Sequence, residues 1–318
     1  MMMLKYIGSL AVLLVMSVMY EKYKKKETFD DETKQYELVR KYLLNHSSLA
    51  QSKKPILWIH MNYEINARSW SSFGSRNNEN LNQPYILLCI KSIIDKCGND
   101  FNICIIDDTS FGKILPGWTI DLHMTADPIR GKLRELALAR LLHSYGGILV
   151  PKSFICLQSL ISLYENGGDM FVGQFISQNI TSVQTPFFPS SKWMGCAKNS
   201  PVMAEYIQYM ESIVSKDYTE ESHFVGGSDR WFYEKIMEKK INLIGADKLG
   251  IQNIRGKPVT VEMLMSDHFI DLSHHAVGVY VPEDELLKRS AYQWFPRLST
   301  VQVLDSNTNI GKLLLTSH

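Results

Sequence analysis

The stretch from Ala126 to Phe154 constrains the fold more than any other part of the chain, because it orders a helix, a glycine turn and a strand. Pro128 suits the first position of a helix, and Asp127 before it can accept hydrogen bonds from the first free N–H groups. Apolar residues then recur at helical spacing until Gly146 and Gly147, which give the backbone the freedom to leave the helix. We therefore predict a capped helix that leads directly into a buried strand.

Further strands and helices are predicted on both sides of this stretch. Upstream, apolar runs at residues 56–60 and 101–106 predict buried strands, with a helix at 84–97 between them. Downstream, we expect a strand at 169–175 and a helix capped by Ser200. This alternation is typical of an α/β domain with a doubly wound, mostly parallel sheet and flanking helices.

The carboxyl ends of the predicted strands indicate where a ligand would bind, because open parallel sheets hold ligands beyond those ends. Three pairs of residues follow strand ends, and we expect them to converge on one site: His60 and Asn62, Asp107 and Asp108, and Pro151 and Ser153. The expected convergence follows from topology and from no single motif.

The helix, the glycine turn and the strand together carry a family resemblance. Residues 145–149 read Tyr-Gly-Gly-Ile-Leu, and with the helix before them they resemble the core of glycosyltransferase family 32 and of the capsular-polysaccharide-synthesis glycosyltransferases. The similarity extends over roughly residues 55–171. It implies a GT-A-like fold that binds a nucleotide-sugar donor, with Gly146 and Gly147 near that donor.

One part of the family pattern is missing from this chain. In those families the strand is followed by Asp-x-Asp, which binds a divalent metal that holds the nucleotide diphosphate, whereas Pro151 and Ser153 stand at those positions here. We therefore expect no metal bound at this motif. The Asn-Gln-Pro-Tyr element at residues 82–85 is similar to an element in proteins of large DNA viruses, so the chain looks like a divergent, virus-like form.

Three acidic positions are candidates for chemistry, and each has a structural alternative. Asp107 and Asp108 either bind the donor or a replacement metal, or form a turn. Glu135 replaces a family aspartate near the donor sugar, or it is an exposed helical residue. Asp229 either takes a proton from the acceptor hydroxyl or belongs to the first turn of a helix.

Cations at the start of the helix are candidates for replacing the metal. Arg130, Lys132 and Arg134 lie in its first turns, where side chains and helix N–H groups together attract a diphosphate. Arg130 and Arg134 are spaced i, i+4 and share a face, so we expect this pair to contact the donor and Lys132 to point elsewhere. The alternative is a solvated helix face.

Composition excludes several other functions. The formal net charge of +1 gives no support for a nucleic-acid partner. The five cysteines form no Cys-x-x-Cys pair, and the spacing of His268, His274 and His275 fits no standard zinc pattern. No Gly-x-Ser-x-Gly or His-Glu-x-x-His motif indicates a lipase or a peptidase.

The N-terminal region predicts membrane attachment. Residues 6–20 carry no charge, and with residues 1–5 they are long enough to span a bilayer as an anchor at 1–20. A cleaved signal peptide is the alternative, although no small-x-small cleavage site follows. Lysines between 22 and 26 place the main domain on the cytoplasmic side, whereas sequons at Asn45 and Asn179 point the other way. A charged stalk at 21–54 then leads to the domain at 55–318.

Two functions remain open from the sequence. The first is a membrane-anchored glycosyltransferase that moves a sugar from a nucleotide-sugar donor to a glycan or a lipid-linked acceptor. The second is an inactive glycosyltransferase fold that serves as a membrane-anchored binding or structural protein, since fold alone does not establish function.

Overall fold

A computed structural model describes residues 54–61, 83–176, 187–215 and 226–317. Residues 54–111 and 117–318 form one compact unit, and residues 112–116 group with the chain before Lys54 in another. The predicted anchor at 1–20 and nearly all of the stalk at 21–54 lie outside the described residues. No helix in the described part is long and apolar enough to cross a membrane.

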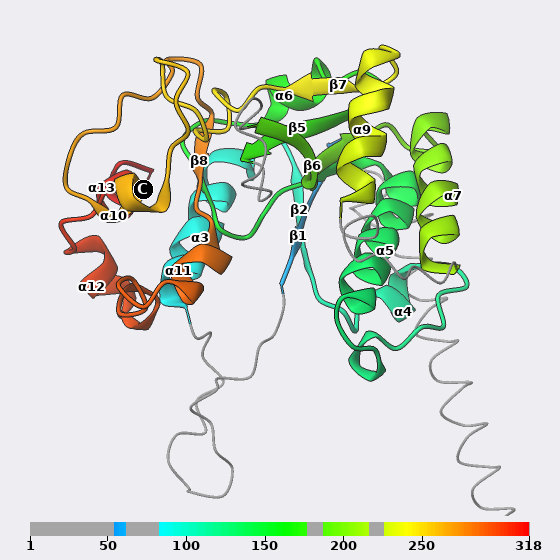
Figure 1. Ribbon diagram of the computed structural model, residues 1–318, viewed down its shortest axis with the longest axis horizontal. Coiled ribbons are helices and arrows are strands. Elements are labelled where there is room, and N and C mark those ends of the chain that lie inside the picture. Colours follow the sequence, from blue (N-terminus) through cyan, green and yellow to red (C-terminus); the bar gives the residue numbers. More distant parts are fainter. Residues whose placement is uncertain (1–53, 62–82, 177–186, 216–225, 318) are drawn as a thin grey trace, which may run out of the picture. The chain divides into compact units, whose positions relative to one another are not determined.

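A six-stranded sheet forms the centre of the larger unit (Figure 1), in the order β2-β1-β3-β6-β5-β7. The strands are β1 (Ile56–His60), β2 (Asn102–Ile106), β3 (Gly147–Leu149), β5 (Met170–Ile176), β6 (Phe187–Cys196) and β7 (Asn242–Ile244). β1 pairs in parallel with both β2 and β3, and β7 pairs in parallel with β5. Only β6 runs against its two neighbours. The predicted α/β class with a mostly parallel sheet is confirmed.

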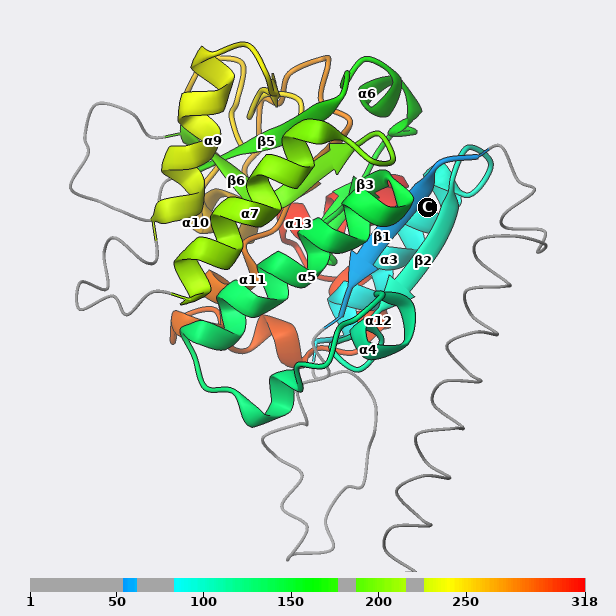
Figure 2. The ribbon, with the colours of Figure 1, turned by 90° about the vertical axis from the view of Figure 1, so that its right-hand side faces the viewer.

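Helices cover both faces of this sheet. Figure 2 shows α5 and α7 in front of the strands, with α3 behind them. The longer helices are α3 (Pro84–Cys97), α5 (Ile129–Tyr145), α7 (Pro201–Ser215), α9 (Gly227–Met237) and α13 (Asn309–Ser317). The short ones are α4 (Phe111–Ile114), α6 (Ile161–Glu165), α10 (Val261–Met265), α11 (Glu283–Lys288) and α12 (Thr300–Leu304), with 3-10 turns at Leu122–Met124 and Phe295–Arg297.

The predicted elements agree closely with the observed ones, apart from the start of α5. The helix begins at Ile129, after Pro128, and no side chain caps its first N–H groups. The expected cap by Asp127 is wrong because the Asp127 carboxylate pairs with Arg130 instead. By contrast, Ser200 accepts a hydrogen bond from the N–H of Met203 at the start of α7, as expected.

The glycine turn after α5 is held by close packing. Gly146 and Gly147 have φ angles of 73° and 103°, which favour glycine. A β-carbon on Gly147 would lie 2.1 Å from the carbonyl oxygen of Ile56 on the neighbouring strand. The turn therefore lets β3 approach β1, and its two glycines lie at the amino end of β3.

A second, smaller sheet continues from the first. β4 (Phe154–Cys156) pairs antiparallel with β8 (Gly278–Tyr280), and Phe154 lies opposite Tyr280. The hydroxyl of Ser153 donates to the carbonyl of Val281 at 2.7 Å and extends this ladder at one end. The buried core includes residues of this small sheet together with α3 and the main sheet.

Candidate functional site

The carboxyl ends of β1 and β2 bring together three residues that the sequence analysis named. His60 Nε2, at the end of β1, lies 2.8 Å from Asp108 Oδ1 just after β2. Arg134 on α5 binds the same carboxylate with two hydrogen bonds, of 2.8 Å from Nε and 2.6 Å from Nη2. The His60 ring stacks on Phe111 at a centroid distance of 5.6 Å. A linked His60–Asp108–Arg134 group therefore marks this edge of the sheet.

The two adjacent aspartates have different roles. Partial burial acts to raise the pKa of Asp108, but hydrogen bonds from Arg134 and His60 outweigh it and hold that pKa well below its usual range. Asp107 instead accepts hydrogen bonds within its own turn, from the backbone N–H of Ser110 at 2.8 Å and from the hydroxyls of Thr109 and Ser110. Asp107 therefore stabilises the turn, and Asp108 carries the charge pairing.

A second network of hydrogen bonds surrounds Glu135, the residue that follows Arg134 on α5. Lys132 donates to Glu135 Oε2 at 3.0 Å and to Ser228 Oγ at 2.9 Å, and the Tyr206 hydroxyl donates to Glu135 Oε1 at 2.5 Å. The Glu135 side chain is only 12% exposed, so the alternative of an exposed helical glutamate is wrong. Burial acts to raise the pKa of Glu135, but Lys132, Ser191 and Tyr206 together lower it, so this carboxylate is ionised.

Asp229, in the first turn of α9, interacts with this network through its charge. Burial first, and then the negative charge of Glu135, raise the pKa of Asp229 to about 6, against the opposing charges of Lys132 and Lys192. The two carboxylates named as catalytic candidates thus interact electrostatically, although 94 positions separate them in the sequence. Asp229 is the one whose proton affinity suits exchange near neutral pH.

Two lysines that the sequence analysis did not name lie at the same edge. Lys152, between Pro151 and Ser153, places Nζ 3.3 Å from Glu283 Oε2, and its side chain is 13% exposed. Burial is the main cause that raises the pKa of Glu283 above its ordinary value. Lys192 on β6 lies 3.9 Å from Asp284, and its charge lowers the pKa of both Asp229 and Glu283. The sequence did hold a sign of Lys152. Pro151 and Ser153 replace the two aspartates of Asp-x-Asp, and a lysine stands between them.

The remaining predicted residues have different places in the structure. Gly146 and Gly147 lie at the amino end of β3, and the Gly146 carbonyl accepts a hydrogen bond from Trp58 at 3.0 Å. Arg130 pairs with Asp127 and Arg134 pairs with Asp108, so the two arginines have different carboxylate partners, and their contact with the donor stays a prediction. Lys132 belongs to the second network, through its hydrogen bonds to Glu135 and Ser228. Asn62 lies outside the described residues.

The residues at the family's metal position do not fit a divalent ion. Pro151 offers no side-chain oxygen, the buried hydroxyl of Ser153 already donates to Val281, and the ammonium of Lys152 lies between them in the sequence. Across the described ranges, no three His, Cys, Asp or Glu side chains gather as a ligand set. His268 is exposed and lies 3.1 Å from Asp267.

Comparisons with solved structures give weak likenesses to glycosyltransferases. The apo form of glycosyltransferase GlyE from Streptococcus pneumoniae TIGR4 has a TM-score of 0.34 and 9% identity, over 62% of this chain and 46% of that chain. The PaToxG glycosyltransferase has a TM-score of 0.33 and 13% identity, over 67% of this chain and 80% of its own. An active-site mutant of LgtC has a TM-score of 0.27 and 10% identity, over 54% and 69%. Likenesses this weak carry no argument about fold or activity.

Comparisons at the level of sequence found no match. No protein-family model matches the chain, and no curated protein matches it.

Proposed function

We propose that this chain is a glycosyltransferase of GT-A type, which transfers a sugar from a nucleotide-sugar donor at the carboxyl edge of its sheet. The observation that carries the proposal is the network of Glu135, Lys132, Tyr206 and Asp229, in which burial raises the pKa of Asp229 to about 6. Interacting carboxylates whose pKa values are shifted in opposite directions are concentrated at functional sites. The resemblance at residues 145–149 supports the same class of reaction.

Asp229 is the base of the proposed reaction. It takes the proton of the acceptor hydroxyl, whose oxygen forms a bond to the anomeric carbon of the donor sugar. The bond between that carbon and the diphosphate oxygen breaks, and its electron pair leaves with the nucleoside diphosphate. A carboxyl with a pKa of about 6 is mostly ionised at neutral pH, so it is ready to accept this proton.

The other residues of the site have positioning and electrostatic roles. Lys132, held between Glu135 and Ser228, keeps the Glu135 carboxylate in place beside Asp229. Arg134 and His60 fix Asp108, which is then available to the ribose or the base of the nucleotide through its remaining lone pairs. Lys152 and Lys192 supply positive charge for the diphosphate, because the residues at 151 and 153 do not fit a metal.

The test is turnover of nucleotide sugars by the full chain. We expect release of a nucleoside diphosphate from one donor in a panel of UDP-, GDP- and ADP-sugars, by transfer or by slow hydrolysis. Asp229→Asn should abolish release but leave donor binding intact, since the aspartate acts on the acceptor side. Glu234→Gln, on the exposed side of the same helix, is the matched control and should keep full activity. Absence of binding to every donor would overturn the proposal and favour an inactive fold.

The membrane anchor at residues 1–20 belongs to the same proposal. It places the domain on the cytoplasmic side of a membrane, where a lipid-linked or membrane-bound glycan acceptor is within reach. The test is protease protection in sealed membrane vesicles. Digestion of the domain from the cytoplasmic side supports the orientation, and glycosylation of Asn179 contradicts it.

A further inference from the structure

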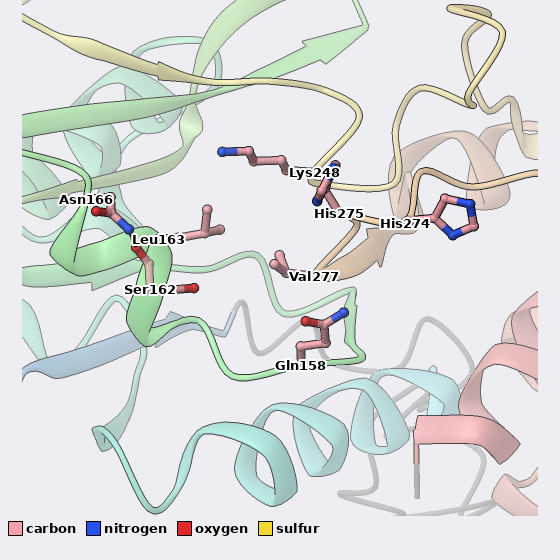
Figure 3. Close-up of a pocket in the computed structure, with 8 residues that line it drawn as sticks. All are labelled: Gln158, Ser162, Leu163, Asn166, Lys248, His274, His275 and Val277. Atoms are coloured by element: carbon pink, nitrogen blue, oxygen red, sulfur yellow. Dashed lines mark hydrogen bonds between the residues drawn. The ribbon is translucent and has the colours of Figure 1, made fainter.

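A cavity of about 260 Å³ lies between α6 and the loop before β8 (Figure 3). Its lining comes from the segment after β4, from α6, from the loop after β7 and from the loop before β8: Gln158, Ser162, Leu163, Asn166, Lys248, His274, His275 and Val277. None of these residues belongs to the networks at the carboxyl edge. Because β4 and β8 pair from Phe154–Tyr280 to Cys156–Gly278, the cavity and the Ser153 end lie at opposite ends of that ladder.

One side of the cavity carries basic groups. Lys248 extends its side chain toward α6, and the His275 ring lies beside it (Figure 3). No acidic residue lines the cavity, and within the described part of the chain the Lys248 ammonium has no ion-pair partner. A lysine beside a histidine, with no acidic residue in the lining, is a favourable place for an anionic group, whereas the His274 ring points away from Lys248 (Figure 3).

Gln158, Ser162 and Asn166 add polar side chains to the lining, and Ser162 and Asn166 are exposed. The amide nitrogen of Asn166 donates to the Ser162 carbonyl at 2.7 Å, and the amide nitrogen of Gln158 donates to the Ala276 carbonyl at 3.4 Å. Both amide oxygens are therefore left to accept hydrogen bonds, and the Ser162 hydroxyl can donate or accept. Leu163 and Val277 add apolar surface between the two sides. Such a wall suits a molecule that carries several hydroxyl groups.

We infer that this cavity is a second ligand site, which binds a phosphorylated sugar. Lys248 and His275 contact the phosphate, and Gln158, Ser162 and Asn166 contact the sugar hydroxyls. The inference needs no transfer reaction, so it stands apart from the proposed function. The same chemistry is offered by a free sugar phosphate and by a phosphorylated glycan chain.

Calorimetry with the full chain tests the site. We expect glucose 6-phosphate to bind at least tenfold more tightly than glucose or inorganic phosphate alone, because only the phosphorylated sugar contacts both sides of the cavity. Lys248→Met should weaken glucose 6-phosphate binding by tenfold or more. Gln158→Leu should weaken it while leaving inorganic phosphate binding unchanged. Lys91→Met, an exposed lysine on α3, is the matched control and should change neither.

Two results would overturn the inference. The first is glucose 6-phosphate binding that Lys248→Met leaves unchanged, because the phosphate would then be bound elsewhere. The second is an absence of glucose 6-phosphate binding by the folded wild-type chain. Binding of a phosphorylated mannan, measured as a second ligand, distinguishes a free sugar phosphate from a phosphorylated glycan chain. Retention of the polymer that depends on Lys248 assigns the site to a glycan chain, and binding of the monomer alone assigns it to a free sugar phosphate.

Discussion

At the scale of single residues, the proposed site depends on how environment separates chemically similar groups. Glu135 and Asp229 interact, yet Lys132, Ser191 and Tyr206 lower the pKa of Glu135, whereas burial and the charge of Glu135 raise that of Asp229. One carboxylate is thus fixed as a charge, and the other is able to exchange a proton. Division of roles between two carboxyl groups in this way is a recurring feature of acid–base catalysis.

The pH dependence of donor turnover should follow Asp229. A base must be ionised to accept a proton, so the rate should rise as pH increases through about 6 and then level off. Lys192→Met removes a charge that lowers the pKa of Asp229, so it should move this limb to higher pH. Lys248→Met, in the separate cavity, should leave the limb in place. A limb that Lys192→Met does not move would assign the titration to another group.

The ion pair of Lys132 and Glu135 should be costly to break from one side. Lys132→Met leaves a buried carboxylate without its cation, and we expect it to reduce the free energy of unfolding by about 3–5 kcal/mol. The double variant Lys132→Met with Glu135→Gln should recover most of this loss, because no buried charge remains. Urea unfolding of Lys132→Met, Glu135→Gln and the double variant measures the coupling. Additive losses would mean that the two side chains do not interact.

The sequence could name several residues of the site but not their surroundings. His60, Asp108 and Asp229 follow from strand ends and from a helix start, which are local patterns. Whether Glu135 is buried depends on Tyr206, which lies 71 residues away, and no pattern near Glu135 reports that contact. For the same reason, the partner of Arg134 could not be predicted to be Asp108.

At the scale of elements, the turn from α5 into β3 shows why local sequence predicts this part so well. Gly146 and Gly147 both have positive φ angles, and Gly147 also lies too close to Ile56 for a β-carbon. The backbone and its packing therefore require the two glycines that made this turn predictable. β6 shows the opposite case. Pro189 interrupts the strand pattern of the β6 sequence. The proline is tolerated because residues 187–190 pair with β5 alone, so within the described residues this part of β6 has one edge without a partner strand. Its second pairing, with β3, begins only at Met194.

Two glycine substitutions on neighbouring elements should have opposite effects. Gly147→Ala places a β-carbon 2.1 Å from the Ile56 carbonyl oxygen, and we expect a loss on the order of 3 kcal/mol or more in the free energy of unfolding. Gly131→Ala on α5 meets nothing within 4 Å, so it should increase that free energy by about 0.5–1 kcal/mol. Thermal and urea unfolding measure both. Equal stability for Gly147→Ala and the wild type would contradict the close approach of β3 to β1.

At the scale of the whole unit, β6 is the strand of the central sheet that pairs antiparallel with a neighbour on each side. Met194 lies opposite Leu149 of β3 and opposite Val172 of β5. β3 and β5 are joined in the sheet order only through β6. The sheet thus consists of two groups of strands that β6 connects.

Amide hydrogen exchange should reflect this arrangement. The backbone amides of residues 194–196 lie in the middle of the sheet, so we expect them to exchange only through global unfolding. The amides of β7, which pairs with β5 alone, should exchange faster through local opening. Mass spectrometry of peptides covering the two strands measures the difference. Faster exchange at residues 194–196 than at β7 would contradict the sheet order.

The position of β6 has a consequence for the order of events on the ribosome. His60, Asp108 and Arg134 belong to the part of the chain that is synthesised before β6, whereas Lys192 lies on β6 and Asp229 follows it. Until β6 has left the ribosome, the nascent chain lacks the strand that connects β3 with β5 in the sheet. Translation that stops before α9 therefore yields a product without the proposed base, and the site is completed only late in synthesis.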